Sequence, residues 1–394
     1  MFRFLALLFA FATLPLGAAV ELGIDTLRAR GYATIEGKRV GLVTNQTGVD
    51  SAGTKTRILL RKASNLRLVA LFSPEHGIDG TAAASQYIPS RKDTVTGLPV
   101  HSLYGPTRKP TPEMLRGIDV LVYDMQDIGV RSYTYVSTMA KCMEACGEQH
   151  IPFVVLDRPN PLGGERVEGP GIEEKWRSFV GQFPVPYLHG MTAGELAKMA
   201  NAYGWNGSRC QLTVVPMQGW SRDMTWSRTG LRWVQTSPNI PRATSVPYYA
   251  ATSIFGSLEG AALDVGIGTD SPFQTAGKCG MNPGAFVRDL RANGLRSAEP
   301  YSRNEFGGAR LNLSADSPVN LAAVNVQLLC AAQRNSRGSI FARYRDPDDI
   351  MWKIYGSTSL RPLIEKGASP AEIVGSWQPI VERFRAARQA FLLY

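Results

Sequence analysis

Polar side chains suited to acting on a sugar follow four apolar segments of this sequence, at the point where each segment ends. They are Asn45 and Gln46; Glu75 and His76; Asp124, Gln126 and Asp127; and Asp157, Arg158 and Asn160. Carboxyl and amide groups suit glycoside hydrolysis, which needs a proton donor for the leaving oxygen and a second group that supports the cationic sugar ring. Turn formation explains one such ending, because Asn, Asp and Gly favour turns. Four endings of this kind favour a functional site.

Other common catalytic motifs are missing. No G-x-G-x-x-G or G-x-x-x-x-G-K-[ST] turn follows the first apolar run, which argues against binding of a nucleotide phosphate. Neither H-E-x-x-H nor G-x-S-x-G occurs, and the four histidines, His76, His101, His150 and His189, are dispersed. We therefore predict no cofactor and no metal site.

Five short runs rich in Val, Ile and Leu predict the strands of a sheet. They lie within residues 39–48, 66–77, 118–129, 151–164 and 210–220. Near-continuous apolar runs are typical of parallel strands that are covered on both faces.

Between these runs, residues 51–64, 132–150 and 192–204 have helical character, and Thr192 with Glu195 forms a capping-box pattern. The alternation predicts an α/β fold with a Rossmann-like, doubly wound parallel sheet. Ligands bind such sheets at the carboxyl ends of the strands, where the polar residues above would lie.

A proline-rich stretch around Asn239 predicts a boundary between two domains. We expect a Rossmann-like catalytic domain over residues 20–243 and a smaller α+β C-terminal domain over residues 244–394. In the second domain, residues 322–330 predict a short strand, and residues 359–369 and 371–394 predict helices. The last helix carries an apolar stripe that indicates core packing: Ile373, Val374, Trp377, Ile380, Val381 and Phe384.

The first 19 residues have the pattern of a secretory signal peptide. Arg3 precedes an apolar core, and Gly17 and Ala19 are small residues before a cleavage position. Cleavage would leave a periplasmic or secreted protein without stable membrane insertion, and an uncleaved anchor is the alternative. The net charge of +10 is spread along the chain, without the patch that nucleic acid needs. The cell envelope is therefore the expected anionic partner.

The cysteine count is odd, so at least one thiol stays outside any intramolecular pairing. The five are Cys142, Cys146, Cys210, Cys279 and Cys330. The first two are one helical turn apart, which predicts that both pack on one face of a helix. One disulfide is compatible with the sequence, without an assignment of its partners.

Seven motifs in order resemble the NamZ family. They are "GLVTNQTGVD", "LFSPEHGIDG", "VYDMQDIGVRSYTYVSTM", "LDRPNPLGG…VEGP", "HGMTAGELAKM", "QTSPNIP" and "FRAARQAFLLY", and they extend from about Gly41 to Tyr394. Members of this family are exo-β-N-acetylmuramidases, which remove terminal N-acetylmuramic acid (MurNAc) from the non-reducing ends of peptidoglycan fragments. The resemblance implies a Rossmann-like first domain, a smaller C-terminal domain and an active site between them. It also implies MurNAc–GlcNAc oligosaccharides as substrates.

The resemblance assigns the general acid to Glu75, in the P-E-H-G turn. A general acid must keep its proton near neutral pH, which an apolar wall or a second carboxylate promotes. Glu168 and Asp124 are the candidates for a second catalytic carboxyl group. Capping of a following helix is the structural alternative for Glu75.

Eight further residues are candidates for substrate binding: Asn45, Gln46, His76, Asp127, Arg131, Tyr133, Asn160 and Glu259. Arg131 suits the lactyl carboxylate of muramic acid, because a guanidinium binds a carboxylate with two hydrogen bonds. The alternative is an ion pair of Arg131 with Asp124 or Asp127 that holds the loop. His76, Tyr133 and Asn160 each have an equally simple structural role, in a loop, in packing and in a turn respectively.

The stretch "EGAALDVGIGTDSPF", residues 259–273, departs from the family pattern. Ala261 and Ala262 replace a polar pair, and Ile267 stands where an arginine is common. This departure keeps a second hypothesis open, a non-catalytic protein that binds peptidoglycan or muropeptides. A third, an amidase or esterase acting on wall peptides, would need a metal or nucleophile that the sequence does not reveal.

Overall fold

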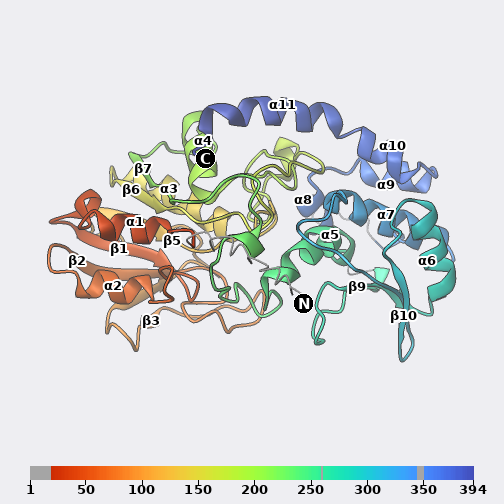
Figure 1. Ribbon diagram of the computed structural model, residues 1–394, viewed down its shortest axis with the longest axis horizontal. Coiled ribbons are helices and arrows are strands. Elements are labelled where there is room, and N and C mark those ends of the chain that lie inside the picture. Colours follow the sequence, from red (N-terminus) through yellow and green to blue (C-terminus); the bar gives the residue numbers. More distant parts are fainter. Residues whose placement is uncertain (1–18, 259–260, 344–349) are drawn as a thin grey trace, which may run out of the picture.

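The computed structural model describes residues 19–258, 261–343 and 350–394, and its first part is a seven-stranded sheet (Figure 1). All five predicted strands are confirmed: β1 Arg39–Thr44, β2 Arg67–Ser73, β5 Val120–Asp124, β6 Phe153–Leu156 and β7 Leu212–Val215. Two short strands, β3 Arg91–Lys92 and β4 Pro99–Ser102, extend the sheet beyond β2. The strand order is β3-β4-β2-β1-β5-β6-β7, and only β3 runs antiparallel to its neighbour.

Helices cover both faces of this sheet, which explains the apolar character of its strands. Leu42 and Val122 point to the face covered by α1 Gly23–Ala29 and α2 Thr56–Lys62. Val43 and Leu121 point to the face covered by α3 Tyr135–Glu148 and α4 Ala193–Tyr203. The four side chains have no exposed surface. The doubly wound α/β fold is therefore confirmed.

The predicted start of α4 is also confirmed. The Thr192 hydroxyl accepts a hydrogen bond from the backbone of Glu195, and the Glu195 carboxylate accepts one from the backbone of Thr192. This reciprocal arrangement satisfies two donors that a helix N-terminus otherwise leaves unpaired.

The order in which strands are added to the sheet reverses between β1 and β5, which are parallel, and this switch positions the candidate site. From β1 the chain continues through β2 to β4 on one side, and it then crosses to β5 on the other side of β1. In open α/β sheets such a switch point opens a crevice at the carboxyl ends of the strands. The loops after β1, β2 and β5 meet there.

The second part contains a four-stranded antiparallel sheet and helices. Its strands, in the order β10-β11-β9-β8, are β8 Leu263–Asp264, β9 Thr275–Cys279, β10 Glu299–Arg303 and β11 Phe306–Arg310. Its helices are α5 Val246–Gly256, α6 Pro283–Ala292, α7 Leu321–Arg334, α8 Ile350–Tyr355, α9 Leu360–Glu365, α10 Pro370–Gly375 and α11 Gln378–Arg388. Short 3-10 helices occur at Ala33–Ile35, Glu174–Trp176, Trp226–Arg228, Ala243–Ser245 and Gln389–Phe391.

Two predictions about this second part need correction. Residues 322–330 form no strand but lie inside α7, which begins after the N-cap Asn320. Helix α7 is central and buried almost all round, so its sequence reads as a continuous apolar run without helical periodicity. The predicted final helix is two helices, with Pro379 in the first turn of α11. Its stripe is buried at Ile373, Trp377, Val381 and Phe384, whereas Ile380 is exposed.

Helix α11 returns from the second part to the first, and Figure 1 shows it passing over the top of the molecule toward α4. Arg388 at its end donates hydrogen bonds to the carbonyls of Gly164, His189 and Gly190 at 2.9, 3.0 and 2.6 Å. Arg166 reaches in the opposite direction, to the carbonyls of residues 315, 317 and 319. The guanidinium groups of the buried Arg388 and the partly buried Arg166 therefore join the two parts through backbone carbonyls.

All five cysteines are free thiols, so the structure contains no disulfide between them. Cys142 and Cys146 are both buried on α3, as their spacing predicts. Residues 1–18 of the predicted signal peptide lie outside the described residues. Within the described ranges, no helix has the length and apolar character needed to span a membrane.

Candidate active site

Glu75 lies half-buried just beyond the carboxyl end of β2. Its Oε1 accepts a hydrogen bond from the backbone N–H of Ser85 at 3.0 Å, and its Oε2 accepts one from the Thr134 hydroxyl at 2.9 Å. Two donors from different loops thus orient the carboxyl group without burying it completely. Such a group can transfer a proton to a bound ligand, as glycoside hydrolysis requires.

The register of two neighbouring strands places Tyr104 beside Glu75. Ser73 at the end of β2 pairs with Ser102 at the end of β4, so the residues two positions further along each strand emerge side by side. The Tyr104 hydroxyl faces the Glu75 carboxylate, and burial together with this carboxylate raises the pKa of Tyr104. Tyr104 was not among the predicted site residues, because β4 is too short and too polar to be recognised as a strand.

His76 supports the loop that carries one donor to Glu75. Its backbone is left-handed, with φ of 68°, and its Nδ1 lies 2.8 Å from the carbonyl oxygen of Ala82. This contact closes a turn after which Ser85 reaches Glu75. The geometry agrees with the structural alternative for His76, and its contact with a substrate stays a prediction.

Polar atoms without partners gather at the switch point between β1 and β5. Among the described residues, no hydrogen-bond partner exists for the buried Asn45 Nδ2, Gln126 Oε1 and Asp127 Oδ1. Thr47 joins the first two residues, because its hydroxyl contacts Asn45 Oδ1 at 2.5 Å and accepts from the Gln126 backbone at 2.9 Å. Buried polar groups are rarely left unpaired, so these atoms indicate a place where water or a ligand completes the hydrogen bonding.

Gln46 contributes to the same region through a different contact. Its Nε2 donates to the carbonyls of Gln235 and Thr236 at 2.8 and 3.0 Å. The hydroxyl of Tyr135 also donates to the Thr236 carbonyl. The segment that leaves the large sheet is thereby held against the loop after β1.

Aromatic rings connect this region to the second part of the molecule. Tyr133 packs edge-on against Tyr135 and Tyr249, with ring centroids 4.9 and 5.8 Å apart. Tyr249, on α5, packs in turn against Phe273 at 5.0 Å. Tyr133 is buried, so it acts as a core ring between the two parts and presents little surface for stacking on a sugar.

Asp127 is a buried acidic group at the switch point. Its Oδ2 accepts a hydrogen bond from the backbone N–H of Gly129 at 2.7 Å. Burial nevertheless raises the pKa of Asp127 to about 7. Near neutral pH this carboxyl group therefore exists in both protonation states, which suits a second acid–base group.

Asp124 does not have the environment expected of a catalytic group. Its Oδ1 accepts a hydrogen bond from Arg158 Nε at 2.5 Å, and its Oδ2 accepts one from the Thr56 hydroxyl at 2.5 Å. The Asp124 side chain has no exposed surface. This buried ion pair joins β5 to the loop after β6, so the geometry argues against the predicted catalytic role.

Arg131 likewise differs from its predicted role. Its Nη1 donates to the carbonyls of Pro170 and Val185, both at 2.7 Å, and its Nη2 donates to those of Ile354 and Tyr355, both at 2.9 Å. The residue is only 2% exposed. These contacts occupy both terminal nitrogens, which argues against the expected binding of a lactyl carboxylate. Among the described residues, Arg131 also forms no ion pair with Asp124 or Asp127.

Asn160 has the turn role that was its alternative. Its Oδ1 accepts from the backbone N–H of Leu162 at 3.0 Å, and its Nδ2 donates to the Met191 carbonyl at 3.1 Å. Both ends of the buried amide are therefore used inside the protein. The predicted contact of Asn160 with a substrate has no support from this geometry.

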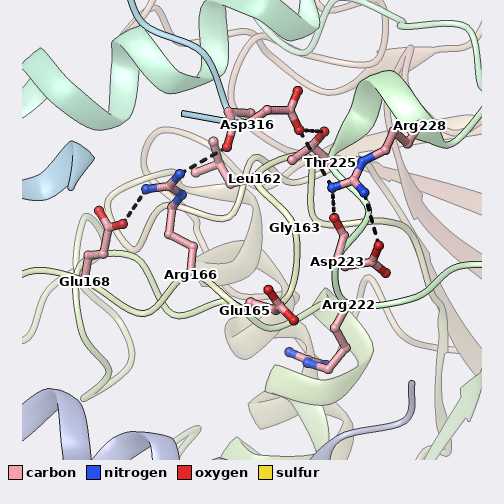
Figure 2. Close-up of a pocket in the computed structure, with 11 residues that line it drawn as sticks. Leu162, Gly163, Glu165, Arg166, Glu168, Arg222, Asp223, Thr225, Arg228 and Asp316 are labelled. Atoms are coloured by element: carbon pink, nitrogen blue, oxygen red, sulfur yellow. Dashed lines mark hydrogen bonds and ion pairs between the residues drawn. The ribbon is translucent and has the colours of Figure 1, made fainter. Parts of the chain in front are cut away.

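Glu168 lines a separate cavity of about 350 Å³, which Figure 2 shows. It forms an ion pair with Arg166, and its Oε2 accepts from the backbone N–H of Ala322 at 3.2 Å. Burial raises the pKa of Glu168. None of the residues that line the cavity is a hydrogen-bond partner of Glu75. The role of Glu168 as a second catalytic group beside Glu75 stays a prediction.

The structure describes residues 261–273 of the stretch that departs from the family pattern. Glu259 lies outside the described residues, so its predicted role stays a prediction. Ile267 is 55% exposed in a turn between Gly266 and Gly268. Phe273 at the end of the stretch is buried against Tyr249, which brings this segment close to the candidate site.

A metal site would need several His, Cys, Asp or Glu side chains close together. Across the described ranges, no three His, Cys, Asp or Glu side chains lie together in a suitable arrangement. The groups at the Glu75 carboxyl are the Ser85 backbone N–H and the hydroxyls of Thr134 and Tyr104, which also form hydrogen bonds with sugars.

Two family models together match nearly the whole chain. The model described as exo-β-N-acetylmuramidase NamZ, N-terminal, matches residues 40–244. The model described as exo-β-N-acetylmuramidase NamZ, C-terminal, matches residues 248–394.

Individual relatives agree with these models. The peptidoglycan β-N-acetylmuramidase NamZ of Bacillus subtilis (strain 168) is 36% identical over an alignment of 421 positions, which covers 100% of this chain and 99% of that protein. A DUF1343 family protein of Bacteroides fragilis NCTC 9343 has a crystal structure that is 37% identical, with a TM-score of 0.87, covering 95% of this chain and 99% of that one. A second DUF1343 crystal structure from the same organism is 30% identical, with a TM-score of 0.77 and coverage of 96% and 99%.

Proposed function

Because the chain belongs to the NamZ family of exo-β-N-acetylmuramidases, we propose that Glu75 is the general acid with which it releases terminal MurNAc from peptidoglycan fragments. The observation that carries this role is the pair of donors that orient the Glu75 carboxyl group, the Ser85 backbone and the Thr134 hydroxyl. The other candidate carboxyl groups are engaged in ion pairs, Asp124 with Arg158 and Glu168 with Arg166.

The chemistry follows from this geometry. Protonated Glu75 gives its proton to the glycosidic oxygen, the bond from that oxygen to the anomeric carbon breaks, and the electron pair leaves with the oxygen. Water then completes the hydrolysis by adding OH to the anomeric carbon and returning a proton. Asp127, at the switch point between β1 and β5, has a pKa that suits proton exchange at neutral pH, because burial raises it to about 7.

The proposed substrates are MurNAc–GlcNAc oligosaccharides cut from peptidoglycan, attacked from their non-reducing ends. The name of the Bacillus subtilis relative supports a peptidoglycan substrate. The signal-like pattern of residues 1–19 supports action in the periplasm or outside the cell, where such fragments arise.

Replacement of Glu75 by glutamine tests the general acid. We expect E75Q to lose about 10²- to 10⁴-fold in kcat on a MurNAc–GlcNAc disaccharide, as is typical when acid catalysis is removed. A dinitrophenyl MurNAc glycoside, whose leaving group needs little protonation, should lose much less. The matched control is E382Q, on the exposed face of α11.

Two results would speak against the proposal. Equal losses on both substrates would mean that Glu75 does not donate the proton. Saturable binding of the disaccharide by the unaltered protein without release of free MurNAc would instead support the hypothesis of a non-catalytic binding protein.

A further inference from the structure

Arg108 is an exposed guanidinium close to the candidate active site whose hydrogen-bonding capacity is unused. Among the described residues, no carboxylate or carbonyl forms a hydrogen bond or ion pair with it. In contrast, Arg131, Arg158 and Arg166 all donate to protein oxygens at 2.5–3.1 Å. Its N–H donors are therefore available to a bound ligand.

Two aromatic rings hold Arg108 in place. Its guanidinium carbon lies 4.5 Å from the centroid of the Phe179 ring and 5.5 Å from that of the Tyr104 ring. The two rings are themselves neighbours, with centroids 6.2 Å apart. Stacking on aromatic faces orients a guanidinium and leaves its in-plane N–H donors available, which is the geometry that binds a carboxylate with two hydrogen bonds.

Tyr104 connects this group to Glu75. The Tyr104 hydroxyl faces Glu75, whereas its ring contacts Arg108, so a single tyrosine separates the general acid from the free cation. Arg108 and Phe179 also line a cavity of about 630 Å³, a volume typical of ligand sites, which begins on the side of Arg108 away from Glu75 and is not lined by Glu75 or Tyr104. A sugar whose anomeric end meets Glu75 can therefore extend a substituent along Tyr104 toward Arg108.

We propose that Arg108 binds the lactyl carboxylate of MurNAc and makes the enzyme selective for this acidic sugar. This inference rests on the proposed function, because only muramic acid among the peptidoglycan sugars carries that carboxylate. It assigns to Arg108 the role that the sequence suggested for Arg131, whose donors are already used by the protein. Phe179 and Tyr104 are the positioning residues of this site.

The test combines a change in the protein with a change in the substrate. A chromogenic MurNAc glycoside is compared with the same compound in which the lactyl carboxylate is a neutral carboxamide. We expect the unaltered protein to favour the acid about tenfold in kcat/KM, since charge-assisted hydrogen bonds contribute on this scale. R108Q should lose about tenfold on the acid and nothing on the carboxamide, so that the preference disappears, and R108K should keep part of it.

The control variant is R61Q, which removes the same charge from an exposed position on α2 and should keep the full preference. Thermal unfolding of R108Q shows whether the fold is retained. A preference for the acid that persists in R108Q would overturn the inference.

A binding measurement separates this inference from the proposed function. Calorimetric titration with MurNAc and with its lactyl carboxamide reports the same preference without any turnover. Loss of the preference in R108Q, in a protein that hydrolyses neither glycoside, would support the carboxylate site and refute the proposed function. Equal affinity of the unaltered protein for both sugars would refute the carboxylate site alone.

Discussion

Replacement of Arg131 by methionine should destabilise the protein strongly without acting on substrate recognition. The Arg131 guanidinium joins the loops of the large sheet, at Pro170 and Val185, to the end of α8, at Ile354 and Tyr355. Methionine fills a similar volume but donates no hydrogen bond. The buried carbonyls would therefore lose their donor.

The expected magnitude follows from those carbonyls. The Pro170 carbonyl keeps a second donor, the backbone N–H of Tyr187 at 3.0 Å. The other three carbonyls, of Val185, Ile354 and Tyr355, would be left without the donor that Arg131 supplies. Each unpaired buried carbonyl costs about 1–3 kcal/mol, and apolar packing of the methionine offsets part of the loss. We expect the free energy of unfolding to fall by about 3–5 kcal/mol, the lower part of the range that three unpaired carbonyls give. This is a large fraction of the roughly 5–15 kcal/mol that stabilises a typical domain.

Urea denaturation followed by circular dichroism measures this change. The control is R39M, which removes an Arg39–Asp119 ion pair whose side chains are 52% and 33% exposed. Solvent screens such a surface pair, so R39M should cost far less stability than R131M. If Arg131 instead bound the substrate carboxylate, R131M would raise KM for MurNAc glycosides with little loss of stability. That result, or equal stability losses in R131M and R39M, would refute the reasoning.

Two further predictions concern the groups around Glu75. T134V should lower kcat at least about tenfold with KM unchanged, because a hydrogen bond to a carboxylate contributes about 1.5–3 kcal/mol. T134S keeps the hydroxyl and should retain activity. Equal losses in both variants would contradict an orienting role for the hydroxyl. Burial raises the pKa of Asp127 to about 7. Between about pH 4 and 7 the folded protein therefore binds more protons than the unfolded chain. As a result, the stability that this carboxyl group contributes falls as the pH rises through 7. D127N removes this titration, so its free energy of unfolding relative to the unaltered protein should increase by roughly 1 kcal/mol per pH unit from pH 5 to 7 in urea titrations. A pH-independent difference would show that Asp127 is not the buried acid that its geometry indicates.

Local patterns were sufficient for the large sheet and for the position of Glu75. Continuous apolar runs predicted β1, β2, β5, β6 and β7, because strands buried on both faces must be apolar throughout. The polar residues that follow them had to lie at one edge, since parallel strands end together. The same rule wrongly predicted a strand at residues 322–330 within α7, because a helix buried on all sides is also an unbroken apolar run.

The hydrogen-bond partner of each polar side chain could not be predicted from local sequence patterns. Asp124, Arg131 and Asn160 have the residue types of a binding site, yet their contacts are with Arg158 and with backbone carbonyls and amides inside the protein. Arg108 has the same chemistry and is left free. These assignments depend on segments up to 224 residues apart in the chain, such as the contact of Arg131 with Tyr355.

The amino-acid order thus specified which chemical groups would gather at the carboxyl edge of the sheet, because strand formation and strand direction follow from local hydrophobicity. Which of those groups face a ligand emerged only from folding. A charged or amide side chain satisfies its hydrogen bonds with whatever donor or acceptor packing brings within about 3 Å. Strand register brought Tyr104 beside Glu75 and docking of the second part enclosed Arg131, and neither is visible in any short stretch of the chain.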